Sequence, residues 1–225
     1  MKKIIFYSIL ILFACLTCIC CVDNTYNLVR ENISEYRKNI LVYSDDDYFV
    51  SLMSGYRENN YAKDGISNEK LDFTIISLSI NNADAKHDVY YKTTINGIEY
   101  NGKLINNPYD NSYVIDIGTN ATETTTVDIQ FTIDGQTYNF TLNKINADWK
   151  ISGDQALKIS CHNFKDYIRQ SVVDNKFNGE CYVKVVHNDK FSNQFYWYVE
   201  ILAGKNTYAI IINPNTGDIL AQNIS

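Results

Sequence analysis

The chain has 225 residues, of which 45% are hydrophobic and 20% are charged, with 10 glycines and 2 prolines. This composition is typical of a folded protein and excludes a disordered or collagen-like chain. The formal net charge of -6 at pH 7 is the wrong sign for nucleic-acid binding, which needs a basic surface. At roughly 100 to 200 residues per domain, the length allows one large or two small domains.

The first segment, residues 1–22, has the pattern of an export signal or membrane anchor. Lys2 and Lys3 precede an almost uninterrupted apolar run over residues 4–22, as in secretory leaders. The run is long for a cleaved signal and lies at the lower limit for a bilayer span. Lipidation, retention as a single span and plain secretion therefore stay open, and each places the rest of the chain outside the cytoplasm.

Cys15 is the candidate lipidation residue. The preceding residues read Leu-Phe-Ala, and with Cys15 they resemble a bacterial lipobox, although Phe13 departs from its usual pattern. The resemblance implies an extracytoplasmic protein attached to the cell membrane by a lipid, with a single N-terminal span as the alternative and secretion as the lesser possibility. Residues 23–44 are then expected to be a stalk or a short amphipathic helix.

Residues 45–148 are predicted to form an all-β, sandwich-like domain. Asn96-Gly97 and Asp134-Gly135 each lie between two apolar runs, and such pairs supply the positive φ angles of tight hairpin turns. Several short strands without a helix are typical of an antiparallel sandwich or small barrel. The expected strands are 48–53, 71–80, 89–95, 98–104, 113–117, 126–133 and 136–143.

The pattern changes at Trp149, so residues 149–225 are predicted to be a second domain. Ser152 and Gln155 fit a capping box, which predicts a helix that runs to about Ser171. A helix followed by a meander of three or four antiparallel strands forms a two-layer α+β unit. The expected strands are 181–187, 194–202, 207–213 and 218–222.

The segment 154–222 resembles a PepSY domain, a small module of exported and membrane-tethered bacterial proteins. The resemblance is carried by ALKIS at the helix start, YWYVE, YAIIIN and TGDIL in the strands. It covers under a third of the chain, and a cystatin-like domain presents the same kind of pattern. A PepSY-like domain would have one helix on a three- to four-stranded sheet. It implies a module that holds or inhibits a peptidase or another envelope protein.

Two cysteines, Cys161 and Cys181, lie outside the leader. Cys161 belongs to an apolar helical stripe, and Cys181 alternates with Val183 and Val185 on one face of an expected strand, so both sulfurs face a shared core. In an oxidising compartment, a disulfide and two buried thiols are both open. Burial argues against a catalytic cysteine, which needs an exposed and electropositive setting.

No catalytic, cofactor or metal site is expected. The histidines His87, His162 and His187 lack the spacing that places two imidazoles on one metal ion. The chain also contains no nucleophile elbow, phosphate-binding glycine loop or dinucleotide fingerprint. We therefore expect a non-enzymatic protein, and the PepSY resemblance implies that it binds an envelope protein or a peptidase.

Two groups of residues are candidate partner contacts. Tyr56, Arg57 and Tyr61 lie in a polar segment, residues 55–65, that is expected to be a loop. Functional residues concentrate on such loops, although an ion pair from Arg57 to Asp64 explains the segment as well. The alternating pattern of the strand 194–202 directs Tyr196 and Tyr198 outward, where a meander sheet can take a partner. The alternative function is a structural, adhesin-like surface module whose β domain contacts wall polymer.

Overall fold

The computed structural model describes residues 24–59, 69–81, 86–187 and 194–225. It is mostly β, with 58% strand and 13% helix. The helices are α2 (Thr25–Arg30), α3 (Gly153–Asn163) and α4 (Lys165–Gln170). The strands are β1 (Ile33–Ser44), β2 (Tyr48–Glu58), β3 (Lys70–Ile80), β4 (Val89–Ile95), β5 (Ile98–Lys103), β6 (Ile105–Asn106), β7 (Tyr113–Ile117), β8 (Thr126–Ile133), β9 (Gln136–Lys144), β10 (Val172–Val173), β11 (Lys176–Phe177), β12 (Gly179–His187), β13 (Phe195–Ala203), β14 (Asn206–Ile212) and β15 (Ile219–Ile224).

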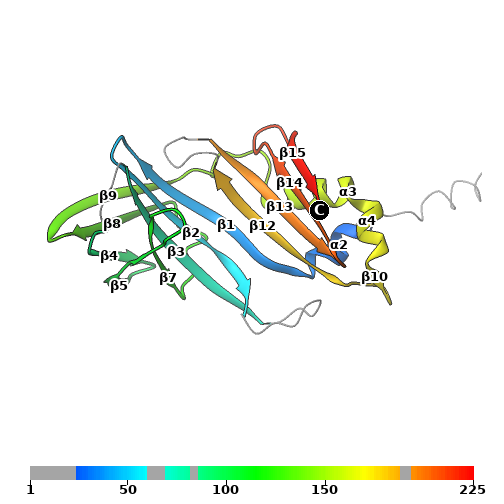
Figure 1. The fold of residues 1–225 in the computed structure, drawn as a ribbon, viewed down its shortest axis with the longest axis horizontal. Helices are drawn as coiled ribbons and strands as arrows, with labels where there is room; N and C mark the ends of the chain where they lie inside the picture. The colour runs from blue at the N-terminus through cyan, green and yellow to red at the C-terminus, as the bar shows by residue number, and fades with distance from the viewer. Residues whose placement is uncertain (1–23, 60–68, 82–85, 188–193) are drawn as a thin grey trace, which may run out of the picture.

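One large sheet runs through the molecule (Figure 1), and within the described residues it contains 13 strands. Its main path is β15-β14-β13-β12-β1-β2-β3-β7-β6, and β9, β8, β4 and β5 branch from β1. The pairing of β1 with β12 is parallel, whereas the other pairings are antiparallel. The branch curls over β1, β2, β3 and β7, so this half of the sheet is barrel-like and nearly closed.

Two hydrophobic cores lie on opposite faces of β1. One core is inside the barrel-like half and contains Leu41. The other lies between the three helices and the strands β12, β13 and β14, and it contains Ile40 and Val42. Because side chains alternate along a strand, consecutive residues of β1 serve different cores, and residues 39–42 are all buried.

β1 is bent where it crosses between the cores. Its register with β2 shifts between Arg37 and Asn39, as at a β-bulge. A Cβ on Gly55 would lie 1.8 Å from the Tyr36 carbonyl oxygen, so the close approach of the two strands needs glycine here. The fully buried Asn39 amide donates to the carbonyls of Ala121 and Thr124 at 2.8 Å each, which ties β1 to the loop after β7.

Several local predictions are confirmed. Asn96, Gly97, Asp134 and Gly135 all have positive φ angles, and each pair forms the turn of a two-stranded hairpin. The capping box is present, because the Ser152 hydroxyl accepts from the Gln155 N–H at 3.3 Å and the Gln155 amide oxygen accepts from the Ser152 N–H at 2.7 Å. Helices α3 and α4 together end within a residue of the expected end at Ser171.

The predicted fold class, a sandwich-like domain followed by a PepSY-like or cystatin-like α+β domain, is wrong. Strands β12 to β15 do not form a sheet of their own with one helix, because β12 pairs with β1 and continues the same sheet. The helical layer consists of three short helices, and α2 comes from the N-terminal part of the chain. The finding is one mostly β sheet with small helices.

The segment expected to be a stalk or short helix also differs. Its first part is helix α2, but residues 33–44 are the central strand β1. The apolar residues 28, 33, 36 and 40 allow helical spacing. A strand forms instead, because an extended chain lets residues 39–42 bury side chains on both faces of the sheet.

The double burial of β1 gives a first prediction. Leu41→Ala should lower the free energy of unfolding by about 2–5 kcal/mol, because the Leu41 side chain is fully buried and its removal leaves a cavity. The matched control is Leu220→Ala, whose side chain is half exposed at the sheet edge and whose loss should change stability by less than about 0.5 kcal/mol. Chemical denaturation measures both, and equal effects would contradict the central position of β1.

Candidate functional site

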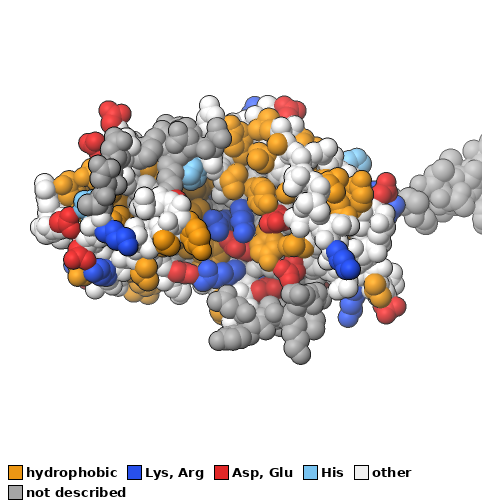
Figure 2. Space-filling model, in the orientation of Figure 1, with side chains coloured by type: hydrophobic (Ala, Val, Ile, Leu, Met, Phe, Trp, Pro, Cys, Tyr) orange, Lys and Arg blue, Asp and Glu red, His pale blue; other side chains and the backbone are white. Residues whose placement is uncertain are grey.

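The candidate site is the end of the sheet formed by β12, β13, β14 and β15. In β13, buried residues that face the helices alternate with half-exposed residues. We call the second set, with its counterparts on β12 and β14, the outer face of the sheet. Tyr196 and Tyr198 belong to it, as their alternation in the sequence predicts. Figure 2 shows hydrophobic side chains gathered over this end of the sheet, beside a group of charged ones.

The outer face carries rows of paired side chains. Lys184, Tyr198, Ile211 and Ala221 lie side by side on the four successive strands. Cross-strand neighbours of this kind stabilise a sheet, so the tyrosine also has a structural role. Burial is the main cause that raises the pKa of the Tyr198 hydroxyl, and the nearby Glu200 carboxylate adds to it. Tyr198 is therefore a neutral aromatic surface at physiological pH.

Strand β15 is the open edge of the sheet. All six of its residues are exposed, and among them Ile219, Leu220 and Ile224 are large hydrophobic side chains. Thr207 and Ser225 exchange both backbone hydrogen bonds, at 2.8 and 3.1 Å. In an antiparallel pair such residues alternate with residues whose backbone groups point away from the partner. By this register, Gln222 and Ile224 direct their backbone N–H and C=O groups to the open edge.

A cluster of charged groups marks the parallel junction of β1 and β12. The Glu35 carboxylate is 2.6 Å from Arg37 Nε and 3.4 Å from Lys184 Nζ. Burial of Glu35 raises its pKa, but the attraction of Arg37 and Lys184 outweighs this effect, so the net pKa is lowered. Lys184 Nζ also lies 4.7 Å from the centroid of the Tyr182 ring. One carboxylate thus lies between two cations, one on each strand, and the cluster is a structural clamp between β1 and β12 that keeps a net positive charge.

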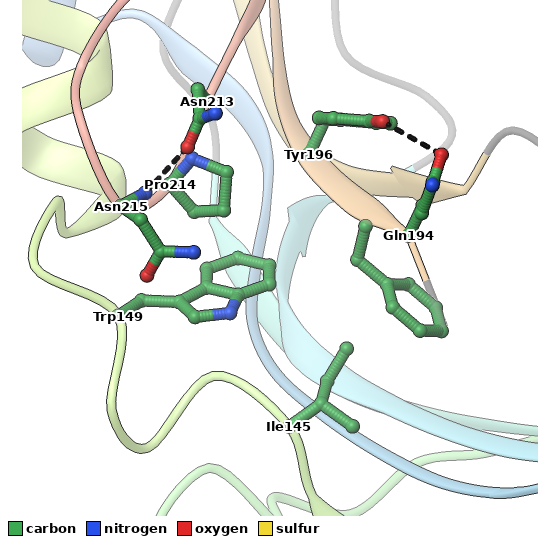
Figure 3. Close-up of a pocket in the computed structure, with 8 residues that line it drawn as sticks. Ile145, Trp149, Gln194, Tyr196, Asn213, Pro214 and Asn215 are labelled. Atoms are coloured by element: carbon green, nitrogen blue, oxygen red, sulfur yellow. Dashed lines mark hydrogen bonds between the residues drawn. The ribbon is translucent and has the colours of Figure 1, made fainter. Parts of the chain in front are cut away.

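A pocket of about 360 Å³ opens next to Tyr196. Figure 3 shows Trp149 and Pro214 on one side of this pocket and Tyr196 and Gln194 on the other. Trp149 is held by an edge contact with Trp197, whose ring centroid is 5.3 Å away. The lining residues are Ile145, Trp149, Gln194, Phe195, Tyr196, Asn213, Pro214 and Asn215, and none of them is charged.

The sequence-predicted contacts on the segment 55–65 are not brought together with those on β13. Residues 55–58 continue strand β2 rather than starting a loop, because all four pair with β3 and residues 55–57 also pair with β1. Tyr56 packs edge-on against Tyr36, with ring centroids 5.7 Å apart, and burial raises the pKa of its hydroxyl to about 12. Tyr61, like Cys15, lies outside the described residues.

Arg57 is held by two structural contacts. It forms an ion pair with Asp116 and lies over the Phe73 ring, with 5.0 Å between the guanidinium carbon and the ring centroid. The alternative partner, Asp64, lies outside the described residues. Strands β1 and β12 separate β2 from β13, so roughly 14 Å lies between Arg57 and the β13 tyrosines at the usual strand spacing.

Cys161 and Cys181 are both buried thiols in the structure. They belong to the same core between the helices and the sheet, as the two patterns predict, but they are not joined. Burial raises the pKa of the Cys181 thiol well above its usual value, and the nearby Cys161 adds to the shift. The arrangement in the structure is thus the pair of unreactive core thiols, not the disulfide.

The described residues contain neither a metal-like cluster nor a membrane-length helix. Nowhere in these ranges do three or more His, Cys, Asp or Glu side chains gather as metal ligands. None of the described helices has the length and apolar character needed to cross a bilayer. Comparison with protein families, with curated proteins and with solved structures found no match for this chain.

Sequence reasoning missed the pocket and the open edge. The sequence marks Trp149 only as the place where the pattern changes, and neither Asn213 nor Asn215 was predicted to line a site. A tryptophan in a polar connection, outside any apolar pattern, is a signal that could have drawn attention to Trp149. The edge position of β15 depends on the order of strands in the sheet, which the sequence does not reveal.

The Glu35 clamp gives a pH-dependent prediction. Because the pKa of Glu35 is lower in the folded protein, its contribution to stability is present above the unfolded pKa of about 4.3 and is lost as the pH falls through the folded value. Glu35→Gln should therefore lower the free energy of unfolding by about 2 kcal/mol at pH 7, and the difference from wild type should close in acid.

The control for this prediction is Glu99→Gln, which removes an exposed ion pair with Lys92. Such surface pairs contribute little to stability, so this variant should follow the wild-type curve. Denaturant titrations at pH 7, 5 and 3 measure the effect. If Glu35→Gln lowered the free energy of unfolding by the same amount at every pH, the stabilisation would not come from the ionised carboxylate, and the prediction would be wrong.

The two thiols give a third prediction. A protein of residues 24–225, purified in an oxidising buffer and denatured without reductant, should show two reactive thiols per chain. The native protein should show almost none, because both sulfurs are buried. Thiol titration with a chromogenic reagent gives both counts, and a denatured count near zero would show that the disulfide forms instead.

Proposed function

We propose that this chain is a non-enzymatic binding protein of the cell envelope that takes an extended polypeptide segment of another envelope protein on the open edge of its sheet. The observation that carries the proposal is β15, an edge strand whose six residues are all exposed. Strand addition to such an edge is a recurring mode of peptide recognition, in which main-chain hydrogen bonds supply the affinity.

The sequence of β15 supports this function. Natural sheets normally protect an exposed edge with charges, proline or a very short strand. β15 reads ILAQNI, with no charge and no proline, and three of its side chains are large, hydrophobic and exposed. β14 also holds its backbone in one register over residues 221–224, and the register shifts only at Leu220, near the start of the strand. An unprotected, ordered and apolar edge favours a partner strand.

The leader supports the location. An apolar run preceded by two lysines directs a chain across a membrane, and either lipidation of Cys15 or retention of the run keeps the protein attached there. The sheet end would then lie on the extracytoplasmic side, where the partner is an envelope protein or a peptidase. Tyr196 and Tyr198 are proposed as contacts for the parts of the partner that extend over the outer face.

The fourth prediction tests strand addition by removing a single backbone N–H group from the open edge. Gln222→Pro removes the backbone N–H that points to the open edge and leaves the hydrogen bonds between β14 and β15 in place. The matched control is Gln222→Ala, which removes the side chain and keeps the N–H. In affinity capture from envelope extracts, wild type and Gln222→Ala should recover the same discrete protein, and Gln222→Pro should recover at least tenfold less.

Two further measurements complete this test. Tyr198→Ala should weaken capture less than Gln222→Pro, because two strand spacings, about 10 Å, separate Tyr198 from β15. Thermal unfolding must show that each variant keeps the wild-type fold. Equal recovery by Gln222→Pro and wild type would contradict the proposal, as would a dimer of this chain that Gln222→Pro dissociates, since the edge would then bind a second copy.

A further inference from the structure

The pocket beside Trp149 is a second feature, separate from the β15 edge, that the proposed function does not use. Its volume of about 360 Å³ lies in the range of small-molecule sites, which are mostly apolar with a few placed polar groups. The apolar part consists of Trp149, Tyr196 and Pro214, and the polar part consists of amide side chains (Figure 3).

The apolar part is held rigidly. Trp149 packs edge-on against Trp197, whose indole N–H donates to the Ile151 carbonyl at 2.7 Å. The Ile151 N–H in turn donates to the Pro214 carbonyl at 2.9 Å. The segment that carries Trp149 is thereby fixed to the turn between β14 and β15. A ligand that enters the pocket meets a preformed aromatic surface, which reduces the entropy lost on binding.

The polar part offers hydrogen-bond donors. The Asn213 side-chain oxygen accepts from the N–H groups of Asn215 and Thr216, at 2.8 and 3.3 Å. Because only the amide oxygen can accept, the Asn213 NH₂ group is the end that stays available. The Gln194 oxygen likewise accepts from the Tyr196 hydroxyl at 3.2 Å, which leaves its NH₂ group available.

Two more polar groups add to this set. Among the described residues, neither the Trp149 indole N–H nor the Asn215 side-chain amide forms a hydrogen bond. The pocket thus presents several unused donors, fewer acceptors and no charge. A matching ligand is neutral, has an apolar face for the aromatic rings and carries carbonyl or hydroxyl oxygens around its edge.

We propose that this pocket binds a neutral N-acetylated saccharide. A pyranose ring has an apolar face of C–H groups that packs on Trp149 or Tyr196, and its hydroxyls can both accept and donate hydrogen bonds. The acetamido carbonyl supplies the additional acceptor that a donor-rich pocket favours. Charged ligands fit less well, because no lining side chain neutralises a charge.

This proposal differs from both functions expected from the sequence. The adhesin-like alternative placed polymer contact on the N-terminal β domain, whereas this pocket lies between the connection after β9, the start of β13 and the turn before β15. It also does not depend on strand addition, because the pocket is lined by residues outside β15. Each proposal can therefore fail without the other.

The test is titration of the purified full chain with the trisaccharide of N-acetylglucosamine, followed by calorimetry and by tryptophan fluorescence. We expect saturable binding and a fluorescence change. Trp149→Ala should weaken binding at least tenfold, and Asn215→Ala, which removes an exposed amide, should weaken it several-fold. Trp149→Phe keeps a ring but loses the N–H and should be intermediate, which keeps the test valid where Trp149→Ala does not fold.

The controls are two variants outside the pocket and two other sugars. Tyr109→Ala, an aromatic residue that is 95% exposed far from the lining set, and Gln222→Pro should both bind as wild type. The glucose trisaccharide lacks the acetamido group and the glucosamine trisaccharide is cationic, so both should bind at least tenfold more weakly. Equal affinity for either sugar, unchanged binding by Trp149→Ala and Asn215→Ala, or no binding at all would overturn the proposal.

Discussion

The structure depends on a strand that is buried on both faces. β1 pairs with β2, β9 and β12, and its consecutive residues Ile40, Leu41 and Val42 supply two separate cores. A strand in this position cannot shift by one residue, because every side chain would then exchange one core for the other. The bulge at residues 37–39 and the close approach of Gly55 fix the register further.

This constraint also positions the candidate site. The Ile145 N–H donates to the Ile40 carbonyl at 3.1 Å, so the connection after β9, which carries Trp149, is attached at its first residue to β1. Near its other end, the same connection is attached to the turn before β15, because the Ile151 N–H donates to the Pro214 carbonyl. The pocket therefore lies between two anchors, one on the central strand and one on the turn before the edge strand. Its geometry follows from the sheet rather than from a flexible loop.

The sequence predicts local features well, because they rest on local chemistry. The hairpin turns follow from Asn-Gly and Asp-Gly pairs, and the helix start follows from the Ser152 capping box. Tyr196 and Tyr198 face outward because β13 alternates strictly. The parallel pairing of Ile33 with Cys181 joins segments far apart in the chain, and no local pattern encodes it. That one pairing converts an expected separate domain into a continuation of the sheet.

The remaining failures have the same origin. Residues 33–44 carry polar and apolar residues at spacings that suit a helix, and only the presence of a core on each face favours a strand. The polar segment around Arg57 suggests a contact on a loop. Strand β2 instead continues beyond Met53, and Arg57 forms an ion pair with Asp116. A side chain that the sequence suggests as a partner contact can thus have a structural role, because strands far away in the sequence supply its contacts.

The turn of residues 213–218 links the two surfaces to which we assign binding. Asn213 caps this turn through its side chain, and the Asn213 N–H donates to the Asp218 carbonyl at 2.9 Å. Gly217 takes the positive φ angle of 81° that lets the chain reverse into β15. The same asparagine thus presents an amide to the Trp149 pocket and fixes the start of the edge strand. The two surfaces share a rigid element, and the register of β15 is set before any partner strand arrives.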